Sequence, residues 1–185
     1  MVSRPLTLRK TVVLVGMMGA GKTAIGRALA TQLGVAFRDS DQVLEDAANM
    51  TIPEIFARDG EAFFREKEMQ VIARLMDADP AVLSTGGGAF LDPRTRDVIA
   101  DKGVAVWLDA DLDILWERVR HKNTRPLLRT PNPRQTLSDL LDARRPVYAQ
   151  ADLRAEAQPH YSIDDMTAAV IDTLAARPDV LEDRP

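Results

Sequence analysis

Short apolar runs rich in β-branched residues alternate along the chain with longer stretches in which apolar residues recur every three or four positions. The short runs predict strands at residues 11–15, 35–39, 81–85, 104–108 and 152–157. The longer stretches predict helices, because a period of about 3.6 residues places apolar side chains on one helical face. Strands that alternate with helices predict an α/β fold with a parallel sheet covered by helices on both faces.

Local signals place the ends of several helices. Residues 22–33 carry one apolar face, and Gly34 is a typical helix stop. Thr51, with Glu54 three residues later, forms a capping box at the start of a second helix, and residues 61–76 predict a longer one. Further helices are expected after the Asp92-Pro93 cap and at residues 111–120, 136–144 and 162–175.

The composition of the chain excludes several classes of function. The 185 residues suffice for one domain with one substantial core, and a net charge of −4 gives no overall attraction to nucleic acid or to an anionic membrane. The absence of cysteine excludes disulfides and thiolate chemistry, and two histidines do not suit a histidine-rich metal site. No signal-peptide pattern or membrane-spanning run is found, so we expect a cytoplasmic protein with frayed ends at residues 1–10 and 177–185.

A glycine-rich segment joins the first strand to the first helix. Residues 16–23 read GMMGAGKT and match the pattern G-x-x-x-x-G-K-[ST]. Glycines let a backbone wrap around an anion, and a helix N-terminus adds the positive end of its dipole. In such a loop Lys22 reaches the β- and γ-phosphates and Thr23 ligates Mg²⁺. The alternative is a glycine turn with a surface lysine, but the position between strand and helix favours a phosphate cradle.

Two other segments follow predicted strands. Asp39 and Asp41 are two residues apart, so a strand period of two places both carboxylates on the same side, at the carboxyl edge of the sheet. One could serve a metal and the other a substrate hydroxyl; the alternative is an exposed acidic turn. Gly86, Gly87 and Gly88 follow the third strand, where close approach of a ligand would justify their entropic cost. A flexible connector is the alternative there.

Residues 118–134 hold five arginines, one lysine and no acid within an acidic chain. Three prolines disfavour a regular helix in the second half of this segment. A mobile cationic segment suits a lid that closes over phosphates. A solvated basic loop or a nucleic-acid patch is the alternative, although no aromatic residue lies in the segment to stack on bases. Arg65 and Arg144, on predicted helices, are by themselves typical of solvated residues.

In this order, the motifs resemble those of the shikimate kinases, within the nucleoside-monophosphate-kinase-like group of P-loop proteins. They are GMMGAGKT, the D-S-D pair, DGEAFFR, STGGGA, NTRPLL and ARRPVY, and the resemblance covers about residues 11–176. It implies a single P-loop NTPase domain over residues 1–185: a three-layer α/β sandwich with a five-stranded parallel sheet and a mobile lid at about residues 121–134. It also implies transfer of the γ-phosphoryl group of ATP to the 3-hydroxyl of shikimate, in aromatic amino acid biosynthesis.

The resemblance further implies a role for each matching residue. ATP is expected to contact Gly19, Ala20, Gly21, Lys22, Thr23, Ala24, Arg118, Arg125 and Pro159. Mg²⁺ is expected at Thr23 and Asp39. Shikimate is expected to contact Asp41, Arg65, Gly86, Gly87, Gly88 and Arg144. The catalytic residues are expected to be Lys22, Asp41 and Arg125.

The chemistry of these residues suits that substrate. Two arginines can pair with its carboxylate, and an aspartate can hold a hydroxyl and accept its proton. We expect shikimate and ATP as partners, without nucleic acid or membrane, and a monomeric chain. A gluconate-type or other small-molecule kinase would not need both arginines. A nucleotide-binding protein without turnover would be free to lose the catalytic side chains, so their joint presence argues against that alternative; they are Lys22, Thr23, Asp39, Asp41 and Arg125.

Overall fold

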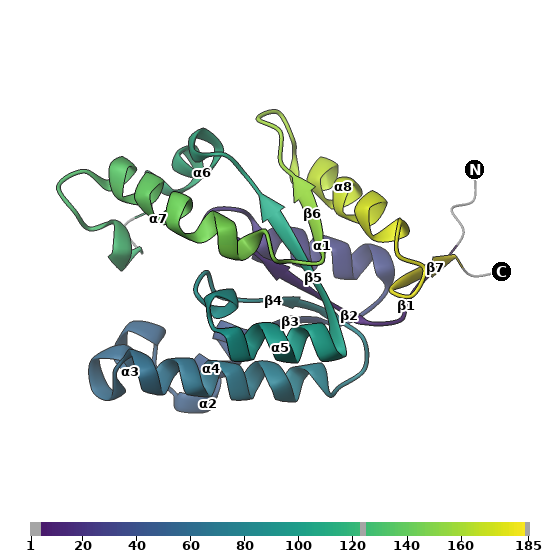
Figure 1. Cartoon of the computed structure of the whole chain (residues 1–185), viewed down its shortest axis with the longest axis horizontal. Coiled ribbons are helices and arrows are strands. Elements are labelled where there is room, and N and C mark those ends of the chain that lie inside the picture. Colours follow the sequence, from purple (N-terminus) through teal and green to yellow (C-terminus); the bar gives the residue numbers. More distant parts are fainter. Residues whose placement is uncertain (1–4, 123–124, 184–185) are drawn as a thin grey trace.

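A computed structural model of the chain describes residues 5–122 and 125–183. Within them, five strands form one sheet in the order β3-β4-β2-β5-β6 (Figure 1). The strands are β2 (Thr11–Val15), β3 (Phe37–Asp39), β4 (Val82–Ser84), β5 (Gly103–Asp109) and β6 (Leu153–Glu156). Each neighbouring pair is parallel, which confirms the predicted five-stranded parallel sheet.

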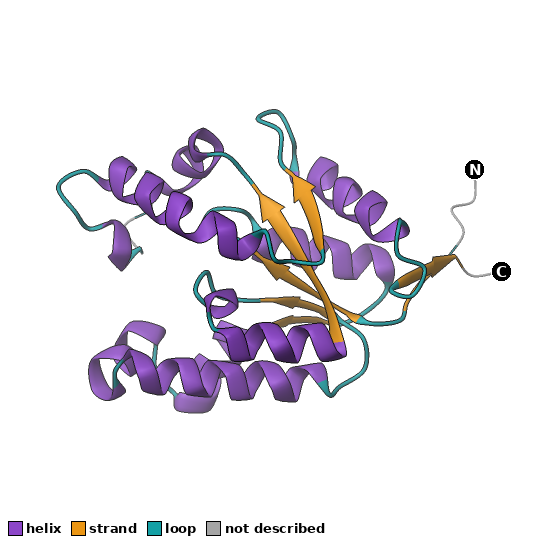
Figure 2. Cartoon of the chain, viewed as in Figure 1, coloured by secondary structure: helices purple, strands orange, loops and turns teal. Residues whose placement is uncertain are grey.

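Helices cover both faces of this sheet (Figure 2). Helices α1 (Lys22–Leu33) and α8 (Ile163–Ala175) contact each other on one face, and α4 (Glu61–Met76) and α5 (Pro93–Lys102) contact each other on the opposite face. The other helices are α2 (Ser40–Ala48), α3 (Ile52–Asp59), α6 (Leu112–Val119), α7 (Pro133–Tyr148) and the 3₁₀ helices η1 (Ala89–Leu91) and η2 (Pro126–Leu128). The arrangement is the three-layer α/β sandwich expected from the sequence.

The central strand β2 and helix α1 hold the glycine-rich segment between them. Val12, Val13 and Leu14 are fully buried, as a central strand covered on both faces requires. Helix α1 lies close to the sheet because Gly26 has no side chain: a Cβ there would lie 2.7 Å from the ring of Phe37. The chain therefore passes directly from the carboxyl end of β2 into the predicted phosphate cradle.

The predicted helix ends are largely confirmed. Gly34 ends α1 in the left-handed region, with φ 65°. At the start of α3, Thr51 accepts a hydrogen bond from the Glu54 N–H, and Glu54 accepts one from the Thr51 N–H over 2.7 Å. Asp92 caps α5 with Pro93 at its first position. These caps satisfy N–H groups that a helix start otherwise leaves without partners.

The expectation that Asp39 and Asp41 share one side of a strand is wrong. Strand β3 ends at Asp39, and the side chain of Asp39 accepts hydrogen bonds from the N–H groups of Asp41 and Gln42. Asp39 is thus the N-cap of α2, and Asp41 lies in the first turn of that helix. The cap turns the chain out of the strand, because an aspartate side chain readily binds N–H groups two and three residues ahead.

Helix α7 is longer than the predicted residues 136–144. Asn132 caps it, and Pro133 occupies the first turn, where a missing N–H breaks no helical hydrogen bond. The helix then continues through Pro146 to a buried end. Packing of its apolar side chains against the core outweighs the cost of that proline. Within the predicted lid, residues 125–134 therefore contain η2 and the start of α7, and residues 123–124 lie outside the described residues.

The two ends of the chain are paired rather than frayed throughout. Strand β1 (Leu6–Leu8) lies antiparallel to β7 (Leu181–Asp183), with Leu8 opposite Leu181. Both of these leucines are buried, and Arg9 binds Glu182 across the pair. Burial of the two leucines and the pairing of the two strands give order to residues 6–8 and 181–183. The composition of these segments had predicted frayed ends. The remaining terminal residues, 1–4 and 184–185, lie outside the described residues.

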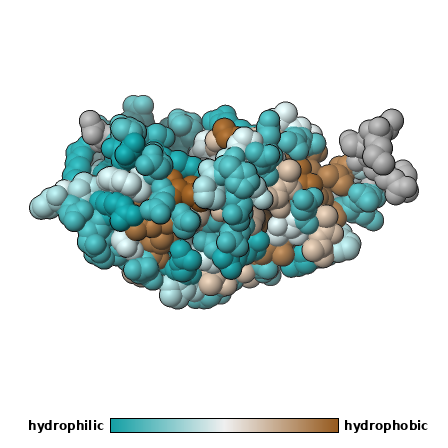
Figure 3. Space-filling model, turned by 90° about the horizontal axis from the view of Figure 1, so that it is seen from above, coloured by the Kyte–Doolittle hydropathy of each residue, from teal (hydrophilic) through white to brown (hydrophobic). Residues whose placement is uncertain are grey.

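Hydrophilic residues dominate the face seen from above in Figure 3, where hydrophobic residues form small separate areas. Across the described residues, the exposed large apolar side chains are Phe63, Leu127 and Ile163. In the same part of the chain, no helix combines the length and the apolar character needed to cross a membrane.

Candidate active site

The glycine-rich segment, residues 16–23, forms a tight loop at the carboxyl end of β2, and we call it the phosphate loop. Gly16, Gly19 and Gly21 have φ angles of 142°, 81° and 93°, which L-residues with a side chain rarely adopt. Gly21 begins α1, and no side chain caps the N–H groups of the first turn. These N–H groups and the helix dipole are a ready site for a phosphate group, so the geometry matches the predicted cradle.

Lys22 is held inside this loop. Its ammonium donates hydrogen bonds to the carbonyls of Gly16 and Met17, at 2.6 and 3.0 Å, and the side chain is buried. Burial, followed by the nearby charge of Arg125, lowers the pKa of Lys22 to about 8. A buried cation beside a second cation is a charge imbalance that a bound polyphosphate would correct.

Two arginines close the other side of the loop. Arg118, on α6, donates hydrogen bonds to the carbonyls of Gly19 and Ala20 at 3.0 and 3.1 Å. These bonds place Arg118 on the loop backbone and do not test its predicted contact with ATP. Arg125 precedes η2, and its Nε is buried without a hydrogen-bond partner among the described residues. A buried unpaired donor beside Lys22 is a second sign that an anion belongs here.

Thr23 and Asp39 come together as predicted for a metal site. The Thr23 hydroxyl is 3.4 Å from Asp39 Oδ2, while Oδ1 of the same carboxylate caps α2. Among the described residues, no group of three or more His, Cys, Asp or Glu side chains could hold a metal ion. One hydroxyl and one carboxylate nevertheless fit Mg²⁺, which usually keeps several waters and binds substrate phosphates beside one or two protein ligands.

The three consecutive glycines lie where three charged side chains meet. A Cβ at Gly86 would lie 2.9 Å from Asp41 Oδ1, one at Gly87 would lie 3.5 Å from Arg144 Nη1, and one at Gly88 would overlap the guanidinium of Arg65. None of these glycines has a positive φ. Gly86 and Gly88 are required for space rather than for backbone conformation, whereas a Cβ at Gly87 would make an ordinary contact. We call residues 86–88 the glycine loop. The structure thus brings together all the residues predicted to bind the substrate.

The side chain of Asp41 lies at this junction. Its Oδ1 is buried and accepts no hydrogen bond within the described residues. Burial and then the charge of Asp39 raise the pKa of Asp41 to about 6. A carboxylate with an unsatisfied oxygen and a raised pKa is well suited to accept a hydrogen bond, and then a proton, from a substrate hydroxyl.

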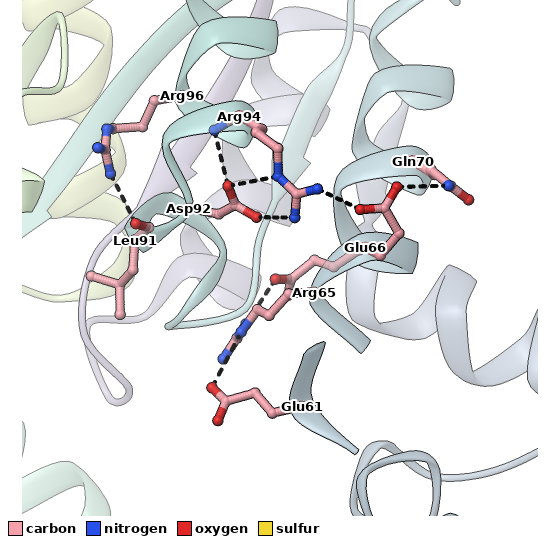
Figure 4. A network of polar contacts seen from close by, with 9 residues as sticks. Glu61, Arg65, Glu66, Gln70, Leu91, Asp92, Arg94 and Arg96 are labelled. Atoms are coloured by element: carbon pink, nitrogen blue, oxygen red, sulfur yellow. Dashed lines mark hydrogen bonds and ion pairs between the residues drawn. The ribbon is translucent and has the colours of Figure 1, made fainter. Parts of the chain in front are cut away.

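Arg65 is positioned by acids on its own helix. Its Nη1 lies 2.7 Å from Glu68 Oε1, and its Nε lies 3.7 Å from Glu61 Oε1. Figure 4 shows Arg65 reaching towards Glu61, below a separate network in which Arg94 bridges Asp92 and Glu66. This network ties the start of α5 to α4, one residue from Arg65. The helix that carries Arg65 is therefore joined to the segment that follows η1.

Two residues of this site were missed by the sequence analysis. Glu68 is 1% exposed, its Oε2 has no hydrogen-bond partner in the described part of the chain, and burial raises its pKa to about 7. Tyr148 is fully buried and donates a hydrogen bond to the Gly87 carbonyl. Helical spacing could have found them, because Glu68 follows Arg65 by three residues and Tyr148 follows Arg144 by four.

Pro159 is the predicted ATP contact that these observations support least. It lies in an exposed turn after β6, and β5 separates β6 from β2 in the sheet. Its contact with the nucleotide stays a prediction. Ala24, in the first turn of α1, lies directly beside the loop.

Comparison with known proteins gives a consistent picture. A family model described as Shikimate kinase matches residues 18–175. The chain is 65% identical over 175 residues to the shikimate kinase of Cereibacter sphaeroides, covering 95% of this chain and 87% of that protein. It is 63% identical over 175 residues to that of Ruegeria pomeroyi, covering 95% and 90%. A solved shikimate kinase from Acinetobacter baumannii, in complex with shikimate, matches with TM-score 0.83 and 35% identity over 90% of this chain and 93% of that chain.

Proposed function

The chain belongs to the shikimate kinase family and is an ATP-using phosphotransferase with an alcohol acceptor, and from this premise we propose how its residues transfer the γ-phosphoryl group to the 3-hydroxyl of shikimate. The observation that carries the proposal is the convergence of Asp41, Arg65 and Arg144 on the glycine loop. One acid and two guanidinium groups match an acceptor that has hydroxyls and one carboxylate.

At the acceptor side, we assign the substrate carboxylate to Arg65 and Arg144, together with the N–H groups of Gly87 and Gly88. Guanidinium groups bind carboxylates through paired hydrogen bonds, so two of them orient the ring as well as hold it. Asp41 then faces a hydroxyl. Its buried carboxylate accepts the proton as the oxygen attacks phosphorus, which follows from its raised pKa and unpaired oxygen.

At the donor side, the N–H groups at the start of α1 hold the phosphates of ATP, and Lys22 and Arg125 balance their charge. The negative charge on the transferring group is spread over its oxygens, so fixed cations lower the barrier without changing position during the reaction. Thr23 and Asp39 would hold Mg²⁺. When bound, this ion would neutralise phosphate charge. We further propose that the enzyme acts as a cytoplasmic monomer.

A coupled assay tests the proposed acceptor. ADP release should be rapid with ATP, Mg²⁺ and shikimate, and should fall to a low background when shikimate is omitted or replaced by gluconate. Equal rates with gluconate would indicate another small-molecule kinase. Tight ATP binding with no turnover on either compound would indicate a nucleotide-binding protein without catalysis.

Removing either guanidinium should weaken shikimate binding. Arg65→Ala or Arg144→Ala leaves the substrate carboxylate half paired, and the loss of such a charge-assisted hydrogen bond costs about 2 kcal/mol. The KM for shikimate should therefore rise roughly 30-fold in each variant, as measured by initial rates at saturating ATP.

Neighbouring arginines supply the controls. Arg145 follows Arg144 on α7 but faces Asp109 at 3.9 Å, and Arg74 lies exposed on the last turn of α4. Arg145→Ala and Arg74→Ala should leave the KM for shikimate within about twofold, since surface charges contribute little. An unchanged KM in both Arg65→Ala and Arg144→Ala would refute the carboxylate assignment.

A further inference from the structure

The last residue of α7, Tyr148, occupies the junction between the glycine loop and the phosphate loop. It is fully buried although it carries a polar hydroxyl. That hydroxyl donates a hydrogen bond to the Gly87 carbonyl at 2.6 Å and lies 4.0 Å from Met17 Sδ. Its ring packs near Trp107 at the end of β5, with centroids 6.2 Å apart. Tyr148 thereby contacts the acceptor side, the donor side and the central sheet at once.

The hydrogen bond to Gly87 is suited to orient a peptide group. Burial raises the pKa of Tyr148, so its phenol stays neutral and keeps its proton to donate. The Gly87 carbonyl and the Gly88 N–H belong to one planar peptide and point in opposite directions. A hydroxyl that holds the carbonyl on one side consequently fixes the direction of the N–H on the other. Glycines have the freedom to rotate this peptide, so an external restraint is needed here.

The N–H groups of the glycine loop are free to bind a ligand. Within the described chain, neither the Gly87 N–H nor the Gly88 N–H donates a hydrogen bond to another residue. Beside them lie the guanidinium groups of Arg144 and Arg65. An anion at this point would therefore meet two cations and a peptide donor whose direction depends on Tyr148.

Tyr148 also stands one helical turn after Arg144, on the same helix. Burial of the tyrosine and of the side chains of Leu137 and Leu141 anchors α7 against the core. Arg144 projects from this anchored segment towards Gly87. One residue thus restrains both the cation and the peptide that face the same ligand group.

We propose that Tyr148 is a positioning residue for the acceptor: its hydroxyl, through Gly87, aims the Gly88 N–H at the substrate carboxylate beside Arg144. This inference rests on the proposed function and names a residue that touches no substrate itself. It deepens the assignment of the acceptor site, since the glycine loop is effective only when its central peptide has one orientation.

Tyr148→Phe removes the hydroxyl and keeps the ring. Losing a buried hydrogen bond and leaving a carbonyl unpaired should raise the KM for shikimate about tenfold, while the KM for ATP and kcat change less than about threefold. A variant that merely loosened the fold would move both KM values together. Equal changes in the two KM values, or a shikimate KM within about twofold of wild type, would overturn the proposal.

Thr167→Val is the matched control. Thr167 is fully buried on α8, and its hydroxyl donates a 2.7 Å hydrogen bond to the Ile163 carbonyl, away from the glycine loop. Both variants should lower Tm by similar amounts, but only Tyr148→Phe should raise the KM for shikimate. If Thr167→Val raises that KM equally, the effect of Tyr148 is one of stability and the inference fails.

A measurement on the wild-type protein covers the case in which Tyr148→Phe does not fold. Shikimate alone, added to isotopically labelled enzyme, should shift the amide resonances of Gly87 and Gly88 strongly. Binding of shikimate without these shifts would contradict the inference and leave the proposed function standing. Absence of shikimate binding and turnover in the wild-type enzyme would instead refute the proposed function itself.

Discussion

Replacing Lys22 by methionine is expected to lower kcat about a thousandfold, because one preorganised cation is lost where charge develops on the transferring phosphoryl group. Methionine has a similar length and no charge. The affinity for ATP should fall far less than kcat, since the N–H groups of the phosphate loop remain. Single-turnover phosphoryl transfer, measured with enzyme in excess over ATP, separates the chemical step from binding.

Lys22→Met is expected to change the stability of the folded chain in two opposite ways. Lys22 is buried beside Arg125, and this like charge opposes its protonation. Removing the lysine relieves that repulsion while freeing the carbonyls of Gly16 and Met17. Lys102→Met serves as the control, because Lys102 pairs with Asp77 on the surface. Activity of Lys22→Met within tenfold of wild type would contradict its assignment.

The second large effect is expected at Asp41. Asp41→Asn keeps the shape of the side chain but removes the group that accepts the hydroxyl proton, a contribution of about 10²- to 10⁴-fold. Phosphoryl transfer should therefore be nearly abolished, while ATP affinity, measured by equilibrium binding, changes little. Loss of ATP binding with intact shikimate binding would place Asp41 at the nucleotide or the metal instead.

The same substitution should stabilise the free protein at pH 7. The pKa of Asp41 is raised from its ordinary value to about 6, so its folded surroundings disfavour the ionised form that predominates at that pH. Asparagine removes this cost, and Tm should rise. Asp46→Asn on the same helix is the matched control, because Asp46 is exposed and contacts only Gln42 among the described residues. It should change neither activity nor stability appreciably.

The elements that the sequence predicted well are those with strong local signals. The apolar run of β2, the capping box at Thr51 and the stop at Gly34 all rest on residues close together in the chain. Helix α2 was missed because the strand pattern was extended to Asp41, although Asp39 ends the strand and caps the helix. The extent of α7 depends on contacts with the core, and proline content gave the opposite expectation.

The candidate site was predictable in its members but not in its geometry. The phosphate-loop motif and the three glycines are contiguous, whereas Asp41, Arg65 and Arg144 meet only after three helices have packed around one loop. The reason for two of the glycines also changed: Gly86 and Gly88 leave room for the charged side chains of Asp41 and Arg65. Tyr148 escaped notice because its role depends on a single carbonyl that is 61 residues away in the sequence.

The β1–β7 pair determines how the molecule would respond to mechanical load applied at its two ends. Leu6 lies opposite Asp183, so the chain enters and leaves this pair at the same end. Tension would unzip the ladder one hydrogen-bonded step after another, rather than shear all of it at once. In Figure 1 the pair lies at the side of the molecule away from α6 and the start of α7. An enzyme pulled between its two termini would therefore yield first at the β1–β7 pair, and the phosphate loop would carry no force until that pair had opened.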